Sequence, residues 1–170
     1  MIDASITWGA RMNNNLPSAD RRRMTSAELA VWRSLIDTTA ELRRRLAVQL
    51  AAESGLSTGD YAVLLALFEA PGRRLRSSEL ADAIDWERSR LSHHLGRMEK
   101  RGLIQRVECA TDSRGAEVVL TEDGARIFRN ATAPHARAIK QHFGDALSPA
   151  QFDALDDILR TITTHLEATR

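Results

Sequence analysis

Basic, hydroxyl and imidazole side chains are concentrated in the segment "DWERSRLSHHLGRMEKRGLI", residues 85–104. Leu91, Leu95 and Met98 recur there at helical spacing and project within about 60° of one another, which marks the core side of a helix. The opposite side carries polar groups: Ser89, Arg90, His93, Arg97 and Lys100. Arginine forms paired hydrogen bonds with guanine, and serine and histidine form shorter, less discriminating ones, so this face suits base edges and phosphates in a DNA major groove. A solvated helix surface has the same composition, and the segment alone leaves both interpretations open.

Charge is unevenly distributed along the chain. The 170 residues have a formal net charge of +1, whereas residues 73–106 carry nine Arg or Lys and five Asp or Glu. A local positive excess within a near-neutral protein is typical of a phosphate-binding segment.

Two helices are predicted before the basic segment. The first covers residues 25–55, where the string "TSAE" places a capping hydroxyl three positions before a glutamate and Gly55 provides the stop. The second, shorter helix starts at Ser57 and ends at the Pro-Gly pair of residues 71–72.

A short third helix and the basic helix follow an arginine-rich connector. The string "RSSELADAI", residues 76–84, is expected to open with a serine cap and to place its apolar residues on one side. Asp85 is expected to cap the fourth helix, and Gly102, before an apolar residue, is expected to end it.

A β-hairpin is predicted next. The strings "LIQRVECA", residues 103–110, and "AEVVLT", residues 116–121, are rich in β-branched residues and flank the turn-forming string "TDSRG". A short helix, a basic helix and a hairpin with a basic tip is the order of a winged helix-turn-helix. In that context Arg114 is expected to enter a minor groove, and Asp112 to hold Arg114 or to cap the turn.

Two helices are predicted to complete the chain. Thr121 is expected to cap a long helix over residues 122–147, with a kink at Pro134 because proline removes a backbone donor. Ser148, followed by proline and then by glutamine three positions on, is expected to cap the last helix, whose apolar stripe is wide enough to need a partner.

The string "RMEKRGLIQRVECATDSRGAEVVLTEDGARIF", residues 97–128, resembles the signature of MarR-type transcriptional regulators. The motif is specific because three elements must occur together, each at its own spacing. They are a basic helix that ends in an E-K-R-G-L run, a wing with the pattern D-x-R-G, and the pattern V-x-L-T-x-x-G that leads into a long helix. The order and length of the helices extend the resemblance more loosely over residues 26–168.

The resemblance implies that the fourth helix binds the major groove of double-stranded DNA through five side chains: Ser89, Arg90, Ser92, His93 and Arg97. It makes Arg114 the wing arginine. Many members carry a threonine-arginine pair where this sequence has Ser92-His93, which puts the preferred operator in doubt. The resemblance also implies a homodimer built from the first and last helices, and such symmetry predicts a pseudo-palindromic operator with half-sites one helical turn, ~34 Å, apart. Occupancy of a promoter would usually repress transcription.

Family members are commonly released from DNA by small, often aromatic ligands, so the resemblance implies a small-molecule effector. Trp32, Tyr61 and Phe68 are the candidates to line its pocket, because large rings suit aromatic ligands. Aromatic residues at helical spacing are more often plain core, and that alternative is the preferred one here.

No cofactor, metal site or enzymatic activity is predicted. His93 and His94 are 100° apart on a helix and cannot share a metal as an i,i+4 pair could. The sequence has no phosphate loop, no nucleophile elbow and no recognisable pair of catalytic carboxylates. The single cysteine, Cys109, precludes an intramolecular disulfide and is a weak candidate for redox sensing.

The expected fold is therefore mainly α with a small β-hairpin wing: a winged helix-turn-helix with N- and C-terminal dimerisation helices. Residues 1–24 are expected to be a mobile arm and residues 25–168 a single domain. Within that domain, residues 25–55 and 122–168 are assigned to dimerisation and residues 57–120 to the DNA-binding lobe.

The absence of a leader or membrane span in the sequence favours a cytoplasmic protein. Two alternatives to a sequence-specific regulator stay open: a winged-helix module that binds only proteins, and a nonspecific architectural DNA binder.

Overall fold

The computed structural model describes residues 23–108 and 116–169. The chain divides into two units, residues 1–39 and 40–170, and each is considered by itself. The predicted arm, apart from its last two residues, and the predicted hairpin tip lie outside the described residues. The domain boundaries expected from the sequence stay a prediction.

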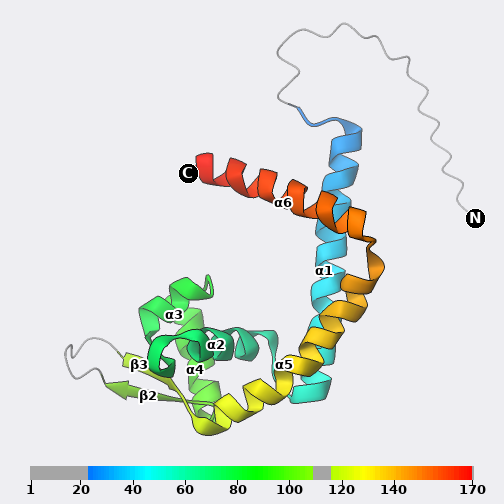
Figure 1. The fold of residues 1–170 in the computed structure, drawn as a ribbon. Coiled ribbons are helices and arrows are strands. Elements are labelled where there is room, and N and C mark those ends of the chain that lie inside the picture. Colours follow the sequence, from blue (N-terminus) through cyan, green and yellow to red (C-terminus); the bar gives the residue numbers. More distant parts are fainter. Residues whose placement is uncertain (1–22, 109–115, 170) are drawn as a thin grey trace, which may run out of the picture. The chain divides into compact units, whose positions relative to one another are not determined.

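The described chain is mainly helical, with one small antiparallel sheet (Figure 1). The helices and strands follow in this order: α1 Ser26–Ser54, α2 Thr58–Glu69, β1 Arg74–Arg76, α3 Ser77–Ala83, α4 Arg88–Lys100, β2 Ile104–Glu108, β3 Ala116–Leu120, α5 Glu122–His142 and α6 Pro149–Ala168. Short 3-10 turns, Pro71–Arg73 and Gly144–Ala146, follow α2 and α5. The winged helix-turn-helix order predicted from the sequence is confirmed.

Capping residues set most helix starts where the sequence places them. The hydroxyls of Thr25, Ser57 and Ser148 each accept a hydrogen bond from the backbone N–H three positions on. The side-chain oxygen of that later residue in turn accepts a hydrogen bond from the backbone N–H of the capping residue. Thr121 accepts from the Gly124 N–H at the start of α5. Gly55 and Gly102 follow α1 and α4 with φ of 68° and 72°, a left-handed conformation that favours glycine.

Three boundary predictions are wrong. The N-cap of α3 is Arg76, not a serine, because the chain passes directly from β1 into the helix and the Glu79 carboxylate accepts from the Arg76 N–H. The N-cap of α4 is Glu87, since Asp85 adopts a left-handed φ of 52° in the turn that ends α3. Helix α5 ends at His142 rather than at residue 147.

The end of α5 has a physical reason. The backbone leaves the helical conformation at Phe143, whose ring packs edge-on against Phe152 with centroids 5.4 Å apart. Helix α5 continues through Pro134, and the kink expected there stays a prediction.

The sheet has the order β1-β3-β2. The hairpin strands β2 and β3 pair from Ile104 with Leu120 to Glu108 with Ala116, as predicted. The connector before α3 also forms a strand, β1, which pairs with β3 from Arg74 with Val119 to Arg76 with Glu117. This third strand was not predicted, because three residues with two arginines give no strand periodicity.

The core of the lobe lies between α2, α3, α4, the sheet and the first half of α5. Leu64, Leu67, Leu80 and Val118 are fully buried there. The Thr121 hydroxyl donates to the carbonyls of residues 102 and 103, which ties the start of α5 to the end of α4. Buried packing of this kind fixes the orientation of α4 relative to the rest of the lobe.

Helix α6 has the opposite character. None of the side chains described for α6 is buried, and its exposed apolar residues include Ile158, Leu159, Ile162 and Leu166. In the other unit, Val31, Trp32 and Leu35 of α1 are also exposed. Among the helices of residues 23–108 and 116–169, none combines the length and the apolar character needed to cross a membrane.

Candidate nucleic-acid interface

Helix α4 has a buried apolar side and an exposed polar side. Leu91, Leu95 and Met98 are at most 1% exposed, as the helical projection predicts. The five side chains predicted to contact DNA from this helix are all exposed: Ser89, Arg90, Ser92, His93 and Arg97. The packed side holds the helix in place while the polar side remains free to bind a ligand.

Four of those five side chains line one open groove. Across this groove, which has a volume of about 590 Å³, they face the capping residue and the first two residues of α2, residues 57–59; the four side chains are Ser89, Arg90, His93 and Arg97. Backbone N–H groups at the start of a helix carry partial positive charge and favour anions such as phosphate. Ser92 instead borders a second depression with Ser77, Ser78 and Arg106, so the structure separates it from the other four.

Arg90 is stacked on a tryptophan. Its guanidinium carbon lies 4.2 Å from the centroid of the Trp86 ring. Such a contact holds the arginine by attraction between the cation and the ring face. Arg90 therefore begins from a fixed orientation, and a base contact would compete with this stacking.

Arg97 is held by two adjacent imidazole rings. One terminal nitrogen lies 2.8 Å from Nδ1 of His94 and the other lies 3.2 Å from Nδ1 of His93. His93 is exposed, whereas His94 is 8% exposed. The predicted reading arginine is thus anchored on one side by a buried residue.

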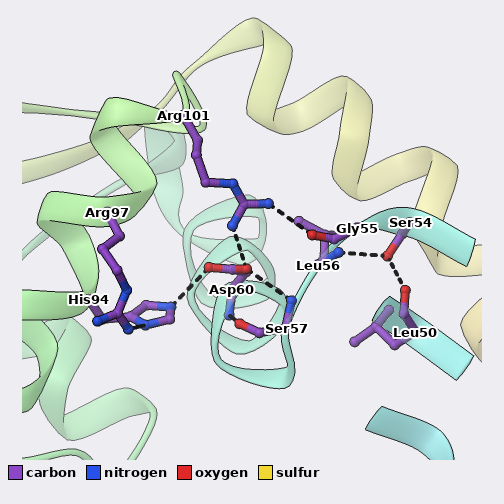
Figure 2. Close-up of polar contacts among 9 residues, drawn as sticks. All are labelled: Leu50, Ser54, Gly55, Leu56, Ser57, Asp60, His94, Arg97 and Arg101. Atoms are coloured by element: carbon purple, nitrogen blue, oxygen red, sulfur yellow. Dashed lines mark hydrogen bonds and ion pairs between the residues drawn. The ribbon is translucent and has the colours of Figure 1, made fainter. Parts of the chain in front are cut away.

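Asp60 lies at the centre of a polar cluster beneath this surface (Figure 2). One carboxylate oxygen is 3.0 Å from His94 Nε2, and the other accepts from Arg101 at 2.7 Å and from the Ser57 N–H at 2.9 Å. Arg101 also donates to the Gly55 carbonyl at 3.0 Å. The cluster therefore connects the end of α1 and the start of α2 with the middle of α4 and with Arg101, the residue that follows α4.

Burial and charge act against each other in this cluster. Burial alone would raise the pKa of Asp60, but hydrogen bonds from Ser57 and Arg101 outweigh it and the pKa is lowered. Burial lowers the pKa of His94 despite the attraction of Asp60. A neutral His94 beside an ionised Asp60 is the resulting state at neutral pH.

Sequence reasoning missed the roles of Asp60, Trp86 and His94. The sequence carried a signal for one of them: in the helical projection His94 lies about 40° from Met98, at the edge of the apolar side, where a histidine needs a buried partner. No local pattern identifies Asp60 as that partner, because its spacing to Ser57 already fits a helix cap.

The predicted ligand-pocket residues lie in different surroundings. Tyr61 and Phe68 of α2 pack against Phe128 of α5, with ring centroids 5.2 and 5.0 Å apart, and Tyr61 also contacts His135 at 4.7 Å. Trp32 belongs to the other unit and is 53% exposed. Two of the three predicted residues, Tyr61 and Phe68, therefore lie in one cluster with Phe128 and His135, which were not predicted to line a pocket.

Asp112, Arg114 and Cys109 lie outside the described residues, so their predicted roles at the wing stay predictions. Within residues 23–108 and 116–169, no three His, Cys, Asp or Glu side chains are grouped so that they could hold a metal ion.

Comparisons with known proteins identify the family. A model described as "MarR family" matches residues 54–115. The chain is 28% identical over 113 residues to the transcriptional repressor MprA of Escherichia coli K12, a match that covers 66% of this chain and 64% of MprA. The chain thus spans slightly less than two thirds of that relative's length.

Two solved structures from Streptomyces coelicolor are similar over nearly their whole length. AbsC, a MarR family transcriptional regulator, is 36% identical with a TM-score of 0.77, covering 86% of this chain and 99% of AbsC. Sco3205, a MarR family transcriptional regulator in complex with DNA, is 38% identical with a TM-score of 0.77, covering 85% of this chain and 94% of Sco3205. These relatives are regulators and not enzymes, and together with the winged-helix geometry they establish that the chain belongs to the MarR family of transcriptional regulators.

Proposed function

We propose that this protein is a homodimeric regulator that binds double-stranded DNA sequence-specifically and represses transcription. The observation that carries the proposal is the two-sided character of α4: its apolar side is packed in the core and its exposed side presents Arg90, His93 and Arg97 in one groove. Arginine and histidine on a rigid helix can bond base edges in the major groove, while neighbouring arginines bind phosphates and set the register. This assignment is supported by Sco3205, which is 38% identical to this chain and whose structure was solved in complex with DNA.

Dimerisation is proposed from the exposed apolar residues of α6 and α1. Ile158, Leu159 and Ile162 lie on one side of α6 and are 44% to 53% exposed. Contiguous apolar surface of this kind is typical of a protein–protein interface. A two-fold dimer would present two copies of α4 to a pseudo-palindromic operator.

A small-molecule effector is proposed at the aromatic cluster of Tyr61, Phe68 and Phe128. His135 contacts this cluster, and its Nδ1 is buried without a hydrogen-bond partner among the described residues. A polar atom of that kind can orient a ligand that displaces part of the packing. A ligand that binds more tightly to a dimer whose two copies of α4 are wrongly spaced for the operator would shift the protein population from the DNA-bound to the free state.

The test is a binding titration of the full chain against its own upstream intergenic DNA and against a scrambled duplex of equal length, at two salt concentrations. We expect tighter binding to the upstream fragment, and salt dependence from counterion release on both. Arg97→Ala and Arg114→Ala should each weaken specific binding on the order of tenfold. Arg160→Ala, at an exposed arginine on the side of α6 opposite Ile158 and Ile162, is the matched control and should leave binding unchanged.

Other outcomes would favour the alternatives. Equal, salt-sensitive binding to both duplexes would contradict sequence selectivity for this fragment and favour an architectural DNA binder or a distant operator. Failure to bind either duplex would favour a protein-interaction module.

A further inference from the structure

The orientation of Arg97 depends on hydrogen-bond acceptors on the two neighbouring histidine rings. A guanidinium group has donors and no acceptor, so each Nδ1 atom that it contacts, on His93 and on His94, must be unprotonated. The His93 ring is exposed and can turn away, whereas the His94 ring is buried. His94 therefore provides the fixed acceptor for Arg97.

Asp60 determines which nitrogen of His94 carries the proton. Its Oδ1 atom lies 3.0 Å from His94 Nε2, although the ring N–H does not point straight along that line. The negative charge favours a proton on Nε2 and leaves the lone pair on Nδ1. Asp60 is itself fixed, because it is 3% exposed and its other oxygen is bonded to Arg101.

The His94 ring is also held in its plane. Trp86 contacts it edge-on, with ring centroids 5.1 Å apart and an interplanar angle of 85°. Gly59 leaves room for both rings, since a Cβ atom there would lie 2.7 Å from Trp86 Cη2 and 3.1 Å from His94 Cε1. A ring fixed in tautomer and orientation gives Arg97 a directional anchor.

We propose that Asp60 and His94 form a positioning pair that orients Arg97 for sequence readout. The proposal rests on the proposed function, since it assigns the groove beside Arg97 to DNA. His94 is a positioning residue here: it acts through Arg97 and lies beneath the surface that receives the base.

The pair also makes the orientation sensitive to protonation. The charged groups that face His94 are Asp60 from α2, Arg97 from its own helix and Arg101, which directly follows that helix. A second proton on the ring would occupy Nδ1 and turn the acceptor into a donor that repels Arg97. Arg97 is therefore anchored while His94 is neutral and released when it is protonated.

The test uses two substitutions, each of which keeps the hydrogen-bonding role of one of the two ring nitrogens of His94. His94→Asn places an amide oxygen near the position of Nδ1 and keeps an acceptor for Arg97. His94→Gln places an amide nitrogen near the position of Nε2, keeps a donor for Asp60 and loses that acceptor. Each is made in the wild-type and in the Arg97→Ala background, and affinity is measured for the duplex that the wild-type protein enriches most from a random pool.

We expect His94→Gln to weaken binding about tenfold, close to Arg97→Ala, and His94→Asn to stay within about threefold of wild type. In the Arg97→Ala background, His94→Gln should have no further effect, because the residue it acts through is gone. Additive losses, or equal losses for both histidine variants, would overturn the proposal. Thermal unfolding of each variant identifies a loss caused by misfolding.

A second measurement needs no DNA. NMR relaxation at Arg97 Nε reports how ordered the side chain is in the free protein. Arg97 should become more mobile in His94→Gln and stay ordered in His94→Asn, and equal order in both would overturn the positioning pair. A wild-type protein that enriches no duplex, but in which Arg97 responds as expected, would refute the proposed function and leave the anchoring intact.

Discussion

The winged-helix lobe and α6 place their apolar side chains in opposite ways. In the lobe, Leu91, Leu95 and Met98 of α4 are buried and the polar side chains face outward. In α6, none of the described side chains is buried, and Leu159 is 52% exposed. The lobe can therefore hold its shape with its own core, whereas the apolar side of α6 would be buried only in the proposed dimer. Substitutions in the two regions should therefore impair different properties: folding stability in the lobe, and dimerisation in α6.

The largest effect is expected for a charge placed on the apolar side of α6. Leu159→Asp would bury two carboxylates in a symmetric dimer and should weaken dimerisation on the order of 100-fold or more, because an unpaired buried charge is costly. Sedimentation equilibrium gives the dimer dissociation constant.

The control for that substitution is Thr164→Asp on the same helix. Thr164 is exposed and lies about 140° around the helix from Leu159. It should leave the dimer intact. A Leu159→Asp protein that remains dimeric and binds DNA would remove α6 from the interface.

Where the lobe joins the start of α5, added volume should affect folding rather than association. A Cβ at Gly124, in the first turn of α5, would lie 2.0 Å from the Leu103 carbonyl oxygen. Gly124→Ala should therefore destabilise the protein by about 3 kcal/mol, measured by urea unfolding.

Gly96 provides a matched glycine in α4. A Cβ there has no neighbour within 4 Å, so Gly96→Ala should stabilise the helix by up to about 1 kcal/mol. Equal effects of the two alanines on stability would contradict the tight junction between Leu103 and α5.

The smallest effect is expected from pH. Burial lowers the pKa of both His94 and His135 in the folded protein, so each contributes stability above the unfolded value of ~6.5 and loses it as pH falls through the folded pKa. Urea unfolding across this range should show stability falling with acidification. His94→Asn and His135→Asn should each flatten that dependence, and an unchanged slope in both would contradict it.

Local patterns predicted much of this molecule. The helix starts at Ser57, Thr121 and Ser148 follow from capping residues and the residues three positions later, which interact within one turn. The exposed and buried sides of α4 follow from helical periodicity. Both kinds of signal need only neighbouring residues.

The positions of interacting side chains from different elements could not be predicted. Asp60 and Arg101 are 41 positions apart and meet only when α2 packs beside α4. Strand β1 forms because β3 offers it an edge, and its own residues show no strand pattern. The type and position of Arg97 were enough to predict that it contacts DNA. The contact between Asp60 and His94 that anchors Arg97 could be identified only from the folded structure.

The role of α4 in DNA recognition is tested most directly by selection of duplexes from a random pool with the wild-type protein and with Arg97→Ala. We expect the wild type to enrich a pseudo-palindromic site with half-sites one helical turn, ~34 Å, apart, and Arg97→Ala to lose selectivity at symmetric positions in both half-sites. Enrichment of no common sequence by the wild type, or an identical site for both proteins, would contradict the assignment of α4 as the reading helix and of Arg97 as a residue that reads the sequence.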